Sequence, residues 1–412
     1  MGESEGAKRS VTNDILSIYV PSFFNTMGMS IVSPIISLYA TSFGVSLAVA
    51  SLAITAHAFG RFLADIPAGI AADRIGRRPV MIIGSILVMV TAFLNASAGN
   101  FTLYLVYRFL EGVGSGMWMT SRQTLLADIL KPEERGRIMG YFQAFMLIGQ
   151  SAGPVIGGFV AAAWGISAPF YAYTATGLFC VVLTYFLIFE PKGAVKRNAE
   201  SGHLFKLSDV TRLLKNQTYS MACLATFVVF FQRSGIRTDM LPIFAANELG
   251  MDPAAIGMIL GYATITNLII TVPIGYAIDL LGRKPVIIWN ILIMAAADIG
   301  FILAKDYWGL VLAAVVMGLA SGGAGQAPLA LATDASLNER RGLAMGVYRL
   351  MGDLGSMIGP IALSAVADAT DLHTPFWVMD GLLVFSAVMV AIFAKEIIKT
   401  RFNKGGSTLS QP

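Results

Sequence analysis

Ionisable side chains stand inside long apolar stretches of this sequence, where an unpaired charge is costly. Arg108 and Glu111 lie three residues apart and could pair on one face of a helix. A carboxyl group in a medium of low dielectric favours its neutral form, so it could take up a proton near neutral pH. Glu111 is therefore the first candidate for a proton carrier, followed by Asp353 and Asp298. The alternative for Arg108 and Glu111 is a static buried ion pair.

Two further groups of charges repeat at helical spacing. His57, Arg61 and Asp65 are four residues apart from one to the next, as are Arg349 and Asp353. Each group therefore lies on one face of its helix, where neighbouring charges could neutralise each other. Counted inward at 1.5 Å per residue, Asp65 lies near the depth of Arg349, and Arg61 near that of Asp353.

The elements that must hold these charges are membrane-spanning helices. The chain has 412 residues and is 56% hydrophobic but only 13% charged, where a soluble domain carries about 25% charged residues. Spanning helices need about 20 mostly apolar residues, and the runs are continuous rather than alternating as in a barrel. The sequence predicts an all-α integral membrane protein with twelve transmembrane helices, at 15–40, 46–70, 79–98, 101–126, 138–163, 168–189, 217–245, 254–278, 285–303, 307–332, 343–367 and 375–396.

Polar segments divide the chain. We expect an N-terminal tail, two six-helix bundles joined by a central loop, and a C-terminal tail, at 1–14, 15–190, 191–216, 217–396 and 397–412. Basic residues concentrate in the tails, the central loop and alternate connections, which predicts that both termini are cytoplasmic in a multi-pass protein of the plasma or inner membrane. Cys180 and Cys223 lie in apolar stretches, which favours buried thiols over disulfides or a metal site.

An internal repeat relates the two predicted bundles. The stretch PAGIAADRIGRRPV at 67–80 returns as PIGYAIDLLGRKPV at 273–286, an offset of 206 residues that glycines elsewhere also follow. Six spans separate the copies, so the bundles share one orientation and are pseudo-symmetric, with substrate expected between them. The membrane charges are not duplicated: Arg61 and Asp65 correspond to Asn267 and Thr271. This difference favours a functional role for the charges over an architectural one.

The repeated turn carries a family resemblance. Its residues resemble the signature loop between helices 2 and 3 of the major facilitator superfamily, and they are Gly69, Asp73, Arg74, Gly76, Arg77 and Arg78. The fifth span, GQSAGPVIGG, is similar to a motif of the drug/proton antiporter branch, and GMSIVSPIISLYA in the first span resembles another, more loosely. Arg108 resembles an arginine that this branch links to proton coupling. The resemblance covers the whole chain and implies two bundles that work by alternating access.

The resemblance also implies contacts across the bundle interface. Helices 2 and 11 touch in this superfamily, so we hypothesise crossed pairs, Asp65 with Arg349 and Arg61 with Asp353, as a cytoplasmic gate. The rival is that each helix neutralises itself. Asp73 is expected at the N-terminus of helix 11, as a latch, with Gly69 and Gly76 allowing tight turns of the chain.

Small residues recur on one face of the fifth span. Gly149, Gly153 and Gly157 are four residues apart, which allows close helix packing in lipid, and Pro154 favours a bend. The predicted helix-packing set also includes Gly158, Gly355, Gly359 and Pro360. By resemblance, this packing would seal the cavity against leakage.

The seventh span adds charges of its own. Arg233, Arg237 and Asp239 could bind an anionic substrate group, or form an outer gate in which Asp239 neutralises one arginine. Aromatic and Met side chains suit an adaptable apolar pocket. The candidate cavity residues are Asn25, Met29, His57, Trp118, Phe142, Gln232, Arg233, Arg237 and Asp239.

Together these features predict a secondary active transporter, with proton-coupled efflux of amphipathic or drug-like molecules as the first expectation. The alternatives are a carrier of an organic anion, sugar or lipid, and a non-transporting membrane receptor or assembly partner. A glycine-rich phosphate loop and metal-ligand clusters are missing from the sequence, which argues against an enzyme. We expect a small-molecule substrate, protons as coupling ion, a lipid bilayer around a monomer, and no cofactor or nucleic acid.

Overall fold

The computed structural model describes residues 11–129, 135–188, 207–336 and 341–396, and every regular element in these ranges is a helix. In the first half the helices are α1 (Val11–Ile31), α2 (Ile36–Thr41), α3 (Leu47–Ala50), α4 (Leu52–Ile75), α5 (Arg77–Ala96), α6 (Phe101–Ile129), α7 (Arg135–Trp164) and α8 (Ala168–Leu187). Within this half α6 packs against α4 and α5, while α8 packs against α1 and α5.

The second half repeats this arrangement. Its helices are α9 (Leu207–Leu214), α10 (Gln217–Gln232), the π-helical η2 (Arg233–Met240), α11 (Leu241–Asn247), α12 (Pro253–Leu281), α13 (Arg283–Leu303), α14 (Tyr307–Ala324), α15 (Gln326–Ala335), α16 (Arg341–Ala369) and α17 (Thr374–Phe393). Here α14 packs against α12 and α13, and α16 against α10 and η2. The chain therefore forms two helical bundles of similar construction.

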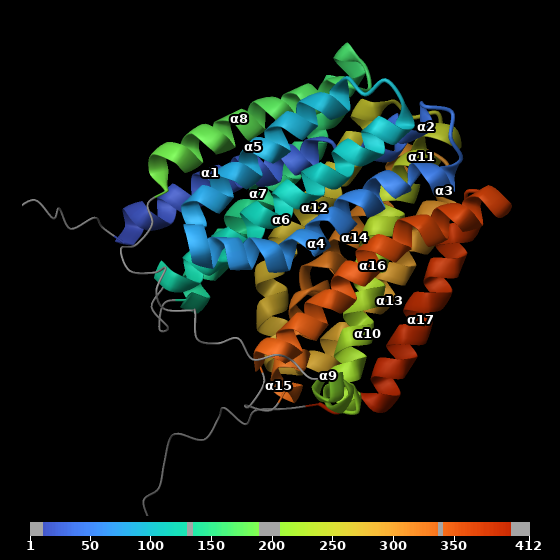
Figure 1. Ribbon diagram of the computed structural model, residues 1–412. Helices are drawn as coiled ribbons and strands as arrows, with labels where there is room; N and C mark the ends of the chain where they lie inside the picture. The colour runs from blue at the N-terminus through green and yellow to red at the C-terminus, as the bar shows by residue number, and fades with distance from the viewer. Residues whose placement is uncertain (1–10, 130–134, 189–206, 337–340, 397–412) are drawn as a thin grey trace, which may run out of the picture.

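The two bundles meet along two seams. One joins α7 to α12, and the other joins α16 to α3 and α4. The bundles converge near α2, α3 and α11 and diverge toward the ends of α8 and α15 (Figure 1). We call the end where α4 passes into α5 the signature-loop end, and the end near α2 and α11 the opposite end.

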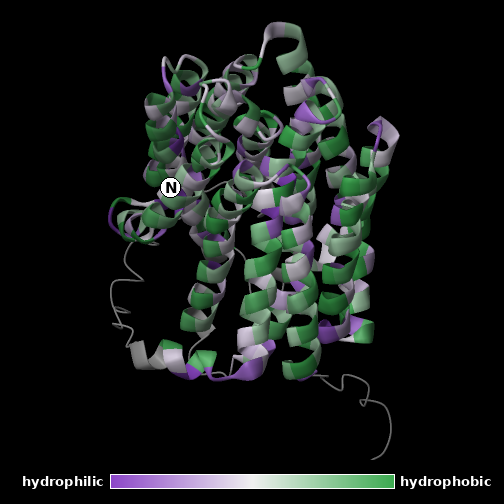
Figure 2. Cartoon of the chain, turned by 90° about the vertical axis from the view of Figure 1, so that its right-hand side faces the viewer, coloured by the Kyte–Doolittle hydropathy of each residue, from purple (hydrophilic) through white to green (hydrophobic). Residues whose placement is uncertain are grey.

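Hydrophobic residues predominate along the lengths of the helices, whereas hydrophilic residues are frequent near helix ends (Figure 2). Within the described residues, nine helical stretches are long and apolar enough to cross a membrane. Of the other predicted spans, the first lies beside undescribed residues, α6 carries Arg108 and Glu111, and α10 is 16 residues long before it becomes η2. The structure is thus consistent with twelve spans, a number that stays a prediction.

Two predicted spans depart from a regular α-helix along their length. The first is interrupted at residues 32–35, between α1 and α2, and the seventh contains the π-helical turn η2. Short π-helical stretches in proteins often occur at functional sites. Both interruptions lie beside the interface between the bundles, since α2 contacts η2.

The predicted close packing of glycines is confirmed. A Cβ atom on Gly149 would lie 3.2 Å from the carbonyl oxygen of Phe23, and added Cβ atoms on Gly153 and Gly157 would clash with α1. Gly158 instead faces α12, where its Cβ would lie 3.0 Å from the Cα of Gly257. In the second half Gly355 and Gly359 face the backbone of α10. Small residues therefore set how closely these helices approach.

One expectation about glycine is wrong. Gly69 lies inside α4, where an added Cβ would lie 4.0 Å from the Thr120 side chain, and it does not form a turn. The turn is made by Gly76 alone, with φ of 101°, a value that favours glycine because it has no Cβ. Its repeat counterpart Gly282 has φ of 94°. The thiols of Cys180 and Cys223 are free and buried, as predicted.

The contact between α7 and α12 generates a stability prediction. Gly158→Val should push the two helices apart and lower thermal stability in detergent, because overpacking costs about 1–3 kcal/mol. Gly140→Val on the same helix is the matched control, since nothing lies within 4 Å of its added Cβ. Equal melting temperatures for the two variants would contradict this account of the interface.

Candidate functional site

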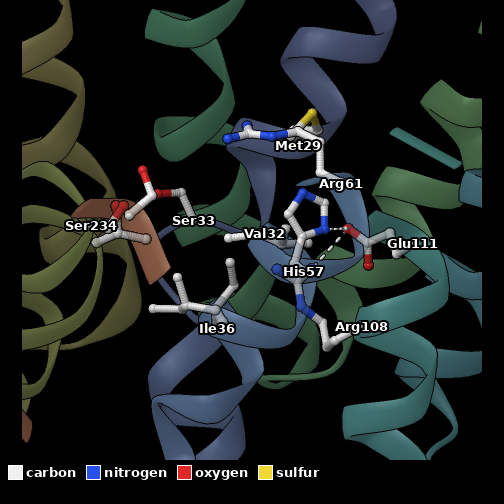
Figure 3. Close-up of a pocket in the computed structure, with 13 residues that line it drawn as sticks. Met29, Val32, Ser33, Ile36, His57, Arg61, Arg108, Glu111 and Ser234 are labelled. Atoms are coloured by element: carbon white, nitrogen blue, oxygen red, sulfur yellow. Dashed lines mark hydrogen bonds and ion pairs between the residues drawn. The ribbon is translucent and has the colours of Figure 1, made fainter. Parts of the chain in front are cut away.

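A cavity of about 170 Å³ lies between the bundles. Side chains from α1, α2, the segment between them, α4 and α6 line one wall, and those from η2 and α16 line the other. The labelled residues converge on it from these elements, with His57 turned toward Glu111 (Figure 3). Its lining residues are Met29, Val32, Ser33, Ile36, Ile54, His57, Ala58, Arg61, Arg108, Glu111, Ser234, Thr238 and Ser356.

The predicted pair of Arg108 and Glu111 forms in this wall. Arg108 Nη1 donates to Glu111 Oε1 at 2.7 Å, and Asn95 Nδ2 donates to the other carboxylate oxygen at 2.7 Å. His57 Nδ1 lies 3.6 Å from Glu111 Oε1. Arg108 and Glu111 are 3% and 1% exposed, so their charges depend on each other and on these hydrogen bonds. Arg108 Nε also donates to the carbonyl oxygen of Ala53.

Both crossed pairs between α4 and α16 are present. Arg61 Nη2 lies 2.7 Å from Asp353 Oδ1, and Arg349 Nη2 lies 3.4 Å from Asp65 Oδ2. The predicted pairing is confirmed. Arg349 also donates to Gln123 on α6 at 3.2 Å. These contacts join the bundles on the signature-loop side of the cavity, where a second hollow of about 390 Å³ adjoins Asp65, Arg349 and Asp353.

A buried carboxylate joins the bundles on the other side of the cavity. Asp239 of η2 is fully buried and accepts hydrogen bonds from Ser37 of α2 and from Ser364 of α16, the latter at 2.7 Å. The alternative in which Asp239 neutralises an arginine is wrong for this structure, because Asp239 forms no ion pair with any arginine of the described residues. Nearby, Asp368 accepts hydrogen bonds from the backbone N–H groups of Leu47 and Ala48. The first cavity thus lies between two sets of contacts that cross the interface.

The signature loop is held by its own charges. Arg77 is 1% exposed and lies 3.5 Å from Asp73, and Arg78 donates to the carbonyl oxygen of Tyr185 at 2.6 Å. Arg74 is exposed in the last turn of α4. The expected partner of Asp73, the start of the eleventh span, adjoins residues 337–340, which lie outside the description. That contact stays a prediction.

The second copy of the loop has a different anchor. Arg283 Nε lies 3.1 Å from Asp334 Oδ2. Glu396 accepts hydrogen bonds from the backbone N–H groups of Arg283 and Lys284 at 2.9 and 2.8 Å. A carboxylate at the first turn of α13 stabilises the helix, because the free N–H groups carry partial positive charge.

Several predicted cavity residues lie in the core instead. Trp118 is fully buried and Phe142 is 3% exposed, and the Arg122 guanidinium lies 4.9 Å from each ring centroid. These two, with Asn25 and Asp239, are not among the residues that line the four described cavities. The predicted placement at the cavity is supported for Met29, His57, Gln232, Arg233 and Arg237.

The candidate proton carrier Asp298 has its own environment. It is fully buried, and Gln232 Nε2 donates to its Oδ1 at 2.9 Å. Its second oxygen and both oxygens of buried Asp380 have no hydrogen-bond partner among the described residues. Two buried carboxyl groups without cations are far less costly when neutral.

Sequence reasoning missed Asn95, Arg122 and Asp380. Arg122 and Asp380 lie inside predicted spans, so the criterion that selected Asp298, an ionisable group in an apolar run, would have found them. Asn95 is uncharged, and only the tertiary structure brings its amide to Glu111.

This chain resembles known proteins over most of its length. The chain is 24% identical over 388 residues to the quinolone resistance protein NorA of Staphylococcus aureus (strain COL), covering 93% of this chain and 97% of the relative. It is 26% identical over 314 residues to multidrug resistance protein 2 of Bacillus subtilis (strain 168), covering 75% and 77%. A solved D-xylose-proton symporter matches with a TM-score of 0.74 at 16% identity, covering 94% and 98%.

The family model of the Major Facilitator Superfamily matches residues 18–238 and again 222–409, so that both bundles are included. Two similar bundles around a central cavity agree with this match. The chain belongs to the Major Facilitator Superfamily and is an integral membrane transporter.

Proposed function

We propose that this protein exports amphipathic, drug-like small molecules in exchange for protons, by alternating access. The observation that carries this proposal is the ionisable cluster of His57, Arg108 and Glu111 in the wall of the cavity between the bundles. The names of the relatives, a quinolone resistance protein and a multidrug resistance protein, support the substrate class.

Glu111 is the proposed proton carrier. It lines the cavity, so a proton and a substrate can reach it from the same space. Protonation would remove its charge and weaken its contact with Arg108, whose guanidinium would then be free to face the cavity. Arg108 is thus a positioning residue, while Asp353 and Asp298 are secondary candidates. Asp353 is already paired with Arg61, and Asp298 with Gln232.

The crossed pairs are the proposed gate at the signature-loop end. Arg61 and Asp353 are 23% and 15% exposed, and Arg349 and Asp65 are 50% and 23% exposed. Exposed ion pairs contribute little net stability, typically about 0–1 kcal/mol, so the more exposed pair of Arg349 and Asp65 can open first during a transport cycle. The hydrogen bonds of Asp239 to Ser37 and Ser364 are the proposed counterpart on the opposite side.

The signature loop and the packing glycines complete this proposal. We propose that the loop, with Gly76, Asp73, Arg74, Arg77 and Arg78, acts as a latch at the same end as the crossed pairs. The glycines of α7 and α16 would let these helices seal the cavity.

The proposed orientation follows the basic residues. Both termini, the signature loop and the central loop would face the cytoplasm of a plasma or inner membrane. We propose a monomer with bundles at 15–190 and 217–396 that catalyses no chemical reaction. The second candidate function, a carrier of an organic anion, is favoured by the arginines Arg233 and Arg237 in the cavities. A non-transporting receptor would not require Glu111.

The proton carrier generates the first transport prediction. Glu111→Gln should abolish substrate movement driven by an imposed pH gradient in vesicles, because an amide cannot exchange a proton. Substrate exchange without a gradient should persist. Glu248→Gln, at an exposed position after α11, is the control. Normal pH-driven transport by the Glu111 variant would refute the assignment.

The crossed pair of Arg61 and Asp353 generates the second transport prediction. Arg61→Asp and Asp353→Arg alone should each reduce transport, because like charges then face each other. The double swap should restore much of the activity and the melting temperature, with a coupling of about 0.5–3 kcal/mol. If the double variant transports no faster than the less active of the two single variants, the two residues do not act as a pair.

A further inference from the structure

The proposed proton-coupling mechanism leaves unused a pair of arginines on η2, Arg233 and Arg237. Arg233 and Arg237 both line a cavity of about 190 Å³ between the bundles, and both also line a neighbouring cavity inside the second bundle. In a π-helix, residues four apart lie almost above each other, because one turn takes about 4.4 residues. The π-helical turn therefore presents two guanidinium groups to the same space.

No carboxylate neutralises these two groups. Among the described residues, Arg233 and Arg237 form no ion pair, and Arg237 donates a hydrogen bond only to the Thr264 hydroxyl. The acids around the interface are already engaged. Glu111 is paired with Arg108, Asp353 with Arg61 and Asp65 with Arg349, while Asp239 is held by two serines.

The walls around the two arginines suit an oxyanion on an apolar body. Hydroxyl and amide groups come from the first bundle, at Ser30, Ser33 and Gln150. Apolar side chains complete the walls at Met29, Leu260, Val229, Phe230 and Met294. The described lining of both cavities contains no acidic side chain. Two cations in a space of low dielectric repel each other until an anion joins them.

We propose that Arg233 and Arg237 form the binding site for the anionic group of the transported molecule, which is an amphipathic organic oxyanion such as an aromatic carboxylate. The inference rests on the proposed transport function and specifies its substrate class. Guanidinium groups bind carboxylates through two parallel hydrogen bonds, and the resulting contact is stronger than one between neutral groups.

The site would also connect substrate binding to movement of the bundles. The arginines belong to the second bundle, whereas Ser30, Ser33 and Gln150 belong to the first. An anion between them therefore contacts both bundles at once. Such a ligand stabilises conformations in which the bundles are close together, since only there are all its hydrogen bonds made.

Binding of three probes with one aromatic body tests the proposal. These are 1-naphthoate, 1-naphthylmethanol and 1-naphthylmethylammonium, titrated calorimetrically into the purified full-length protein at fixed pH. Naphthoate should bind more tightly than the other two by about tenfold, the value of one charge-assisted hydrogen bond. Arg233→Gln and Arg237→Gln should each remove this preference, while binding of the neutral probe persists. Arg237→Lys should retain part of the preference.

Arg212→Gln, on the exposed face of α9, is the control and should bind naphthoate like the unaltered protein. Equal or tighter binding of the ammonium probe, or an unchanged naphthoate preference in both glutamine variants, would overturn the anion site. Retained binding of naphthylmethanol shows that a variant is folded. Because no pH gradient is applied, the result is independent of Glu111 and of proton coupling.

Discussion

The cost of a charge in an apolar medium governs the interior of this protein. Beside the bundle interface, Arg108 and Glu111 neutralise each other within α6. Arg61 and Asp353 do so across the interface. Asp239, which has no cation, is held by two hydroxyl groups instead. Because leaving a buried charge without partners is expensive, the contacts of Asp239 with Ser37 and Ser364 restrict how the bundles can move against each other.

The contacts across the interface differ in strength along its length. Near the opposite end the contacts of Asp239 are buried, whereas Arg349 is half-exposed and lies 3.4 Å from the partly buried Asp65. Water can replace an exposed ion pair at little cost. The structure therefore combines a firm closure on one side of the cavity with a weaker one on the other, and the bundles diverge toward that weaker side (Figure 1).

Glycine residues allow close packing of helices within each bundle. Gly153 and Gly157 bring α7 close to α1, and Gly355 and Gly359 bring α16 close to α10, so each bundle contains the same close contact. Neither contact needs a charge. The repeat thus preserves backbone packing in both halves, while Arg61, Glu111, Arg233 and Asp353 each occur in only one half. This division separates the scaffold from the groups that define the cavity.

The sequence by itself determined the helical membrane fold and the repeat at 206 residues, because apolar length and helical periodicity are local properties. A count from the helix ends matched the depths of the charges on α4 and α16, but their crossed pairing was a hypothesis from the family resemblance, and only the tertiary structure chose it over pairing within each helix. Only the tertiary structure decided which side chains reach the cavity. It placed Trp118 and Phe142 in the core beside Arg122, brought Asn95 to Glu111, and gave Asp239 serine partners. These outcomes depend on the rotation of each helix about its axis, which is set by packing against neighbours far away in the sequence.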